Sequence, residues 1–225
     1  MRKGRAVSGR KAQVNLRVLV HPFFFLNNKQ RGYSAKEADV LFGVWRKEMG
    51  KAAERGHYFA FVSDNLGKGD FKRIESHVAK NRAGSLRGRE EKLLAYALRR
   101  IGKEKLIFVP AEGIISFLKA GHLREKGIVP SKTRAVLFGE RIGGCVKHQR
   151  YLLHEAGIPR QNISILAHRS VEPEPNGISP WTWDAMLAEL KQKGKKSALG
   201  GEHAELAEKL AELARNSGKW KKRGY

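Results

Sequence analysis

Short apolar segments alternate along this chain with longer segments of helical periodicity, and this alternation constrains the fold more than any other feature. Five segments have the length and composition of strands: residues 17–21, 58–64, 106–109, 135–138 and 162–166. They are almost continuously apolar, which is typical of parallel strands that are buried on both faces. The sequence therefore predicts an α/β fold, a three-layer sandwich with a mostly parallel sheet of at least five strands.

Helical segments connect the expected strands. Ser34 and Glu37 have the spacing of a capping box and Gly56 is a typical helix end, so the first long helix is expected over residues 34–55. A second strong helix is expected over 89–101, where apolar side chains form one stripe. Weaker patterns predict a helix over 70–80, a basic loop over 81–88, and helices over 114–126 and 145–155.

One domain accounts for most of the chain. We expect a basic N-terminal tail over residues 1–16, an α/β domain over 17–190, and a C-terminal extension over 191–225. The extension reads as a basic linker, an amphipathic helix over 202–215 and a basic tail. That helix has an apolar stripe that can pack on the domain or on a partner, including a second copy of the chain in a homo-oligomer.

Composition excludes several classes of protein. No apolar run approaches the roughly 20 residues that span a bilayer, so we expect no membrane partner. The basic N-terminus lacks the apolar stretch of a signal peptide. Cys145 is the only cysteine, so no internal disulfide can form, and a reducing compartment is the default. We therefore expect a soluble cytoplasmic protein, and because no close ligand spacing is present, neither a metal nor a cofactor.

The strong positive charge predicts an anionic partner. The chain has 45 Lys and Arg residues against 22 Asp and Glu, which gives a formal net charge of +23. Residues 1–16 contain five cations and no acid, and residues 191–225 contain ten cations and four acids. Such charge attracts polyanions, nucleic acid first, although solubility alone is an alternative explanation.

The edge of the sheet where the strands end is the expected place for a functional site. Cys145 follows the fourth strand and two glycines, at the expected start of a helix. The partial positive charge at a helix N-terminus favours the thiolate, which is the nucleophilic form. A Cys–His pair is the minimum for nucleophilic catalysis. His21 is the best candidate base because it ends the first strand, and His148 lies one helical turn after Cys145.

A set of spaced residues points to a known superfamily. Gly139 closes the fourth strand, Cys145-Val146 follow six residues later, and Gly157 lies twelve residues after the cysteine. Upstream features in matching order are the segment 21–26, Ser116-Phe117, Leu123 and Gly127-Ile128. In these residues the chain resembles the isochorismatase-like cysteine hydrolases, the superfamily that includes nicotinamidases and related amidases.

The resemblance implies a reaction and a set of site residues. In that family a cysteine attacks a carbon–nitrogen bond and forms a thioester, an aspartate acts as general base, and a lysine supports the charged intermediate. In this chain the aspartate position is similar to His21, and the lysine position falls near Ala111 and Glu112. The expected catalytic residues are therefore Cys145, His21 and Glu112. The expected substrate-binding residues are Asp64, Glu140, Gly144, Val146 and His148, with the backbone N–H groups of residues 144–146 as oxyanion donors.

Two functions from different classes remain open. The first is a divergent hydrolase that cleaves a small amide through Cys145. The second is a catalytically inactive member of the same fold that binds nucleic acid or a ribonucleoprotein through its basic surface and tails. Salt separates them, because charge-driven binding falls steeply with ionic strength and hydrolysis of a small neutral amide does not.

Overall fold

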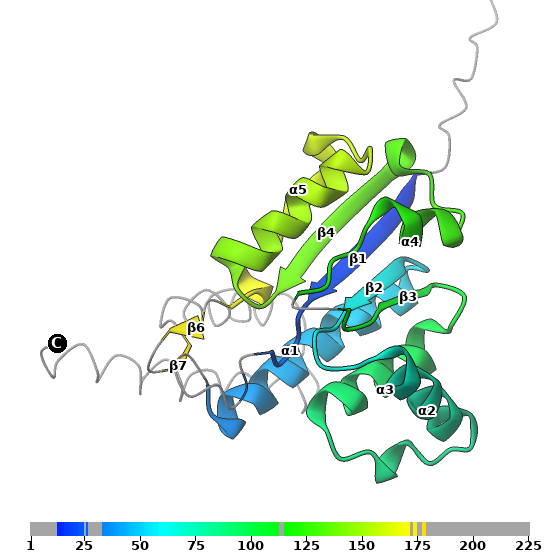
Figure 1. Cartoon of the computed structure of the whole chain (residues 1–225), viewed down its shortest axis with the longest axis vertical. Helices are drawn as coiled ribbons and strands as arrows, with labels where there is room; N and C mark the ends of the chain where they lie inside the picture. The colour runs from blue at the N-terminus through cyan, green and yellow to red at the C-terminus, as the bar shows by residue number, and fades with distance from the viewer. Residues whose placement is uncertain are drawn as a thin grey trace, which may run out of the picture.

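A five-stranded parallel sheet organises the molecule (Figure 1). The computed structural model describes residues 13–24, 26, 33–112, 115–171, 173–174 and 177–178. The sheet has the order β3-β2-β1-β4-β5. Its strands are β1 Val14–Val20, β2 Tyr58–Val62, β3 Leu106–Val109, β4 Thr133–Gly139 and β5 Ile163–Ile165. A separate antiparallel pair follows, β6 Pro173–Glu174 and β7 Gly177–Ile178. The predicted α/β fold with a parallel sheet is confirmed.

Helices cover both faces of the sheet. On one face lie α1 Ala35–Glu54, α2 Lys68–Ala79 and α3 Arg89–Ile101, and on the other lie α4 Ala120–Glu125 and α5 Lys147–Glu155. Short 3-10 turns occupy Ala83–Ser85, Pro130–Lys132, Arg160–Asn162 and Ala167–Arg169, and a π-helical turn, Ile142–Val146, precedes α5. In the described part of the chain, no helix combines the length and the apolar character needed to cross a membrane.

The long helix α1 begins as its sequence predicts. The Glu37 backbone N–H donates to Ser34 Oγ at 3.3 Å, and the Ser34 backbone N–H donates to Glu37 Oε2 at 2.7 Å. This capping box satisfies N–H groups that have no partner within the helix. The inner stripe of α1, which includes fully buried Trp45, packs on the sheet with side chains of α3.

The sheet has a topological switch point between β1 and β4. From β1 the chain winds outward through β2 and β3, and it then returns to the other side of β1 to add β4 and β5. At this point β1 and β4 approach closely, since a Cβ on Gly139 (φ +136°) would lie 2.1 Å from the Val20 carbonyl oxygen. In open parallel sheets, ligands bind outside the carboxyl ends of the strands at such a point.

Three expected boundaries were wrong. Strand β1 begins at Val14, so residues 14–16 belong to the sheet and not to the basic tail, and Leu16 is fully buried. The helix expected over 114–126 is present only as α4, because the chain over 115–119 uses its backbone groups to bond to distant side chains. Cys145 lies in the π-helical turn, and α5 begins two residues after it. The C-terminal helix expected over 202–215 lies outside the described residues.

Candidate functional site

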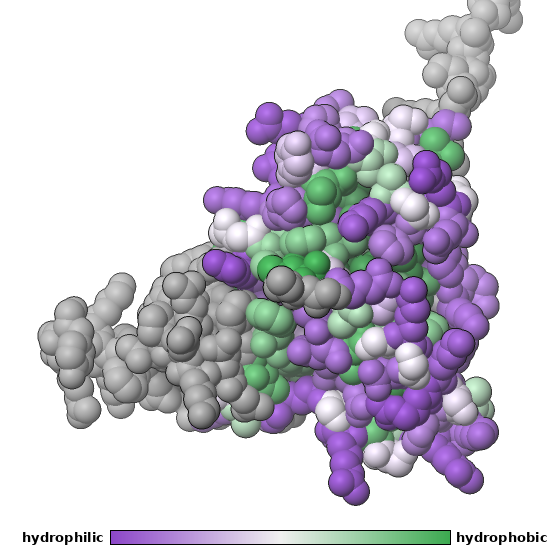
Figure 2. All heavy atoms as spheres, viewed as in Figure 1, coloured by the Kyte–Doolittle hydropathy of each residue, from purple (hydrophilic) through white to green (hydrophobic). Residues whose placement is uncertain are grey.

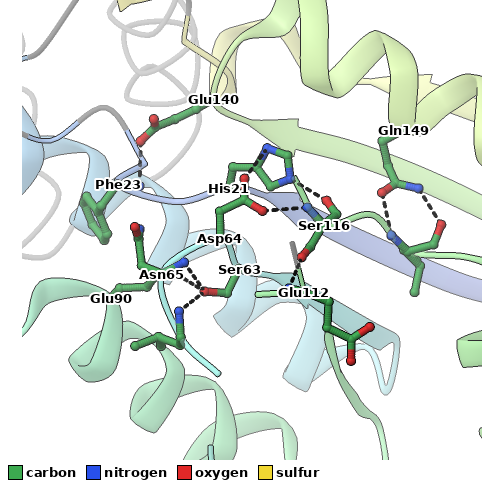
Figure 3. Close-up of polar contacts among 12 residues, drawn as sticks. His21, Phe23, Ser63, Asp64, Asn65, Glu90, Glu112, Ser116, Glu140 and Gln149 are labelled. Atoms are coloured by element: carbon green, nitrogen blue, oxygen red, sulfur yellow. Dashed lines mark hydrogen bonds and ion pairs between the residues drawn. The ribbon is translucent and has the colours of Figure 1, made fainter. Parts of the chain in front are cut away.

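A buried histidine stands at the switch point. The chain turns directly after β1, and His21 adopts a left-handed conformation (φ +50°) with only 1% of its surface exposed. Its Nε2 lies 2.6 Å from the Ser116 carbonyl oxygen, and its Nδ1 lies 3.3 Å from Asp64 Oδ2 (Figure 3). The structure therefore brings together the predicted residues His21 and Asp64, with Ser116 between them.

Ser116 ties the segment after β3 to this pair. Its backbone N–H donates to Asp64 Oδ1 at 2.7 Å, while its side-chain oxygen accepts from the Glu112 backbone N–H at 2.9 Å. Farther along the same segment, the Gln149 side chain of α5 bonds to both the N–H and the carbonyl of Leu118, each at 2.8 Å. These contacts replace the helix that the local sequence pattern predicts.

His21 Nδ1 and Asp64 Oδ2 are buried and face each other, and neither atom has a hydrogen-bond partner among the described residues. Because Nε2 faces a carbonyl oxygen, this nitrogen must bear hydrogen. With an ionised Asp64, a bare Nδ1 would place two lone pairs 3.3 Å apart, so the contact favours a proton on one of the two groups. Burial lowers the pKa of His21, and the Asp64 charge opposes that shift. Burial also raises the pKa of Asp64, and the His21 charge opposes it. The arrangement is a desolvated acid–base pair.

A second carboxyl group lies behind the pair and was missed by sequence reasoning. Glu90, in the first turn of α3, accepts from Ser63 Oγ at 2.5 Å and from Asn65 Nδ2 at 2.8 Å (Figure 3). Burial raises the pKa of Glu90 to about 7, although these two hydrogen bonds favour its ionised form. The polar run Ser63-Asp64-Asn65 after an apolar strand was the available signal, but nothing local identifies Glu90 as its partner.

Glu140 positions the turn that follows β1. It is fully buried and accepts hydrogen bonds from the Phe23 backbone N–H at 2.6 Å and from the Tyr33 hydroxyl. Burial raises the pKa of Tyr33, and the neighbouring Glu140 raises it further. Glu140 therefore holds the turn that contains His21, and the substrate contact expected of it stays a prediction.

Cys145 packs as a core residue. It is 8% exposed and belongs to the apolar cluster on the face covered by α4 and α5, next to fully buried Val146. Two expected oxyanion donors already have a partner, because the N–H groups of Gly144 and Val146 lie 3.0 and 3.3 Å from the Arg141 carbonyl oxygen, to which they donate. The Ser116 carbonyl oxygen engages Nε2 of His21, whereas Nδ1 faces Asp64 and has no hydrogen-bond partner in the described part of the chain. The expected pairing of Cys145 with His21 stays a prediction.

Two further predicted residues lie outside the buried cluster that His21, Asp64 and Ser116 form at the strand ends. Glu112 is exposed and pairs with Lys68, whose Nζ lies 2.9 Å from Glu112 Oε1. The Lys68 ammonium lowers the pKa of Glu112. His148 is also exposed, on α5, and its ring meets Phe117 edge-on with centroids 4.7 Å apart. Phe117 in turn lies beside His21, at a centroid distance of 5.3 Å.

The described acidic and histidine side chains can also be compared with the arrangement of a metal site. Among the described residues, no group of three or more His, Cys, Asp or Glu side chains has the arrangement of a metal site.

No family model matches this chain, and neither a curated protein nor a solved structure matches it.

Proposed function

We propose that this protein binds nucleic acid through its basic surface. The observation that supports the proposal is the separation of its charges. Four carboxylates of the described part, those of Glu48, Asp64, Glu90 and Glu140, are buried in internal networks. Hydrophilic side chains cover much of the described surface on the face shown in Figure 2.

Many exposed cations of the described part have no carboxylate within ion-pair distance. In the described ranges, no carboxylate lies within ion-pair distance of the following exposed side chains: Lys72, Lys80, Arg82, Arg87, Lys92, Arg99, Arg100, Lys119, Arg124, Lys132, Arg134, Lys147 and Arg160. These side chains come from both helical layers and from the sheet edge. A surface of this kind neutralises phosphates and releases the counterions condensed on a nucleic acid, which drives binding.

The buried acids add to this positive field. The formal charge of +23 counts both Asp64 and Glu90 as fully ionised. Burial raises the pKa of both groups, that of Glu90 to about 7. A fraction of Glu90 is therefore protonated at neutral pH, which makes the folded protein more positive than its composition indicates.

The test is binding of the full chain to labelled oligonucleotides at several salt concentrations. Fluorescence anisotropy would compare single-stranded RNA, single-stranded DNA and duplex DNA between about 50 and 200 mM salt. We expect log K to fall linearly with log salt, with a slope that reports the number of phosphates contacted. Absence of binding at the lowest salt, or binding that salt does not weaken, contradicts the proposal.

Hydrolysis of a small amide by Cys145 is a second candidate, favoured by one observation. His21 (φ +50°) and Arg141 (φ +56°) both hold left-handed conformations on the two sides of the switch point. Such backbone strain in residues other than glycine clusters at functional sites. This candidate requires the Arg141 carbonyl and Ser116 to release the groups that they now bind, and thiol reactivity tests it as described below.

A further inference from the structure

A pocket of about 290 Å³ opens between α1 and α3, in the helical layer that covers one face of the sheet. Its lining residues are Phe42, Arg46, Ala83, Gly84, Lys92, Ala95, Tyr96 and Arg99. None of them belongs to the buried cluster at the strand ends. The volume is at the lower end of the roughly 300–1,000 Å³ of ligand pockets, so the pocket suits one small group.

An arginine held by two aromatic rings forms its wall. The Arg46 guanidinium lies 4.4 Å from the Tyr96 ring centroid and 5.7 Å from the Phe42 ring centroid. Phe42 and Arg46 are one turn apart on α1, while Tyr96 reaches across from α3. The Arg46 Nε is buried and has no hydrogen-bond partner among the described residues. This guanidinium is oriented by stacking, and no carboxylate in the described ranges neutralises it.

Two more cations border the pocket. Lys92 and Arg99 lie two turns apart on α3, with Tyr96 between them, and both are exposed. The lining contains three cations and no acid. Small residues keep the space open, since a Cβ on Gly84 would meet no atom within 4 Å. This lining suits an anionic ligand with a planar group that stacks on aromatic or guanidinium surfaces.

We propose that this pocket binds one nucleotide of a single-stranded nucleic acid, with its base stacked among Phe42, Arg46 and Tyr96 and its phosphate between Lys92 and Arg99. This inference rests on the proposed function and gives it a location. An unpaired base can enter a concave pocket and stack on aromatic rings and guanidinium planes, whereas a base inside a duplex presents only its edges. The side chains of Lys92 and Arg99 supply charge-assisted hydrogen bonds to the phosphate oxygens.

The experiment compares matched pairs of charge removals in the full chain. The pocket variant is Lys92→Gln with Arg99→Gln, and the control is Lys132→Gln with Arg134→Gln. All four side chains are exposed, and each variant loses two charges. We expect the pocket variant to weaken binding of a short single-stranded RNA by about tenfold more than the control does, because it removes ordered contacts as well as long-range attraction.

Substitution of the stacking surface tests the base contact. Tyr96→Leu is expected to weaken RNA binding by about tenfold or more, the effect of losing a stacked base, while Tyr96→Phe, which keeps an aromatic ring, is expected to weaken it much less. Circular dichroism checks that both variants fold. Photocrosslinking of wild-type protein to RNA that contains 4-thiouridine is expected to modify the segments that contain residues 42–46 or 92–99.

The outcomes distinguish this inference from the proposed function. If wild-type protein binds RNA, but the pocket variant matches the control or the crosslinks map elsewhere, the pocket assignment is wrong and nucleic-acid binding stands. If wild-type protein fails to bind RNA at low salt, the proposed function fails and this inference fails with it. Equal binding of single-stranded and duplex probes, unaffected by Tyr96→Leu, also overturns the assignment.

Discussion

Replacing Glu48 with glutamine tests how the structure handles its buried charges. Glu48 is 1% exposed on α1 and meets two buried arginines, Arg17 from β1 and Arg169 from the turn after β5. Its Oε1 lies 3.2 Å from Arg169 Nε, and Lys51 reaches the same oxygen from a side chain that is 32% exposed. Burial alone would raise the pKa of Glu48, but Lys51, Arg169 and Arg17 outweigh it and lower the pKa.

The loss in the free energy of unfolding caused by Glu48→Gln follows from the charged side chains that remain in the core. The change keeps the shape of the side chain but leaves the Arg17 and Arg169 guanidiniums, 9% and 2% exposed, without their carboxylate. Removing one member of a buried charge network costs about 3–5 kcal/mol, because the remaining charges stay desolvated. The Lys51 contact adds less than about 1 kcal/mol, since water screens a part-exposed pair.

Urea unfolding at pH 7, followed by circular dichroism, measures this free energy. Glu54→Gln is the matched control, because Glu54 lies on the same helix but is exposed, and it should change stability by less than about 0.5 kcal/mol. A lowered folded-state pKa gives stability that is present above the unfolded pKa of about 4.3 and is lost as the pH falls through the folded pKa. The difference between wild type and Glu48→Gln should therefore shrink below about pH 4. A loss under about 1 kcal/mol at pH 7 would refute the reasoning.

Three further predictions concern the sheet and its edge. Gly139→Ala is expected to prevent folding or to cost several kcal/mol, because a Cβ there would lie 2.1 Å from the Val20 carbonyl oxygen at φ +136°. In thermal unfolding Gly121→Ala, which meets no atom within 4 Å, should be tolerated, and equal behaviour of the two would contradict the close approach. Burial raises the pKa of Glu90 to about 7, above its unfolded value of about 4.3, so its ionisation destabilises the folded state as the pH rises between these values. Urea unfolding over this range should show a smaller loss of stability for Glu90→Gln than for wild type, and identical slopes would count against it. Native Cys145, 8% exposed, is expected to react with iodoacetamide more slowly than in the urea-unfolded chain, whereas a faster native reaction would support the hydrolase candidate.

The sheet was predictable because local signals and the final structure agree. Buried parallel strands must be almost continuously apolar, and the segments that became β2 and β4 show this directly. The start of α1 was equally accessible, since Ser34 and Glu37 satisfy each other within one turn. The order of the strands was a different matter, because it depends on pairings between segments far apart in the chain.

The candidate site was only partly predictable, for the same reason. Residues 115–119 have a helical pattern of apolar side chains, but their backbone groups bond to Asp64 and Gln149, which lie 52 and 31 residues away from their partners. Glu112 and Glu140 each follow a strand, yet one pairs with Lys68 at the surface and the other is buried against Tyr33. A carboxylate after a strand predicts polarity at the edge of a sheet, while its burial depends on which distant groups pack over it.

Contacts within the protein fill the switch point, which favours the outer helical layer for the binding that we propose. In a parallel sheet a ligand at this point would use backbone and side-chain groups at the ends of β1 and β4. Here the protein itself uses several of them: Ser116 and Asp64 engage His21, Glu140 receives the N–H of Phe23, and the Arg141 carbonyl takes the amides of residues 144 and 146. Most of these contacts satisfy a buried polar group that a ligand would have to release at a cost, whereas His21 Nδ1 and Asp64 Oδ2 have no hydrogen-bond partner among the described residues. The cations between α1 and α3 have no ion pair to break, because no carboxylate of the described residues neutralises them. An incoming phosphate therefore displaces only water and counterions.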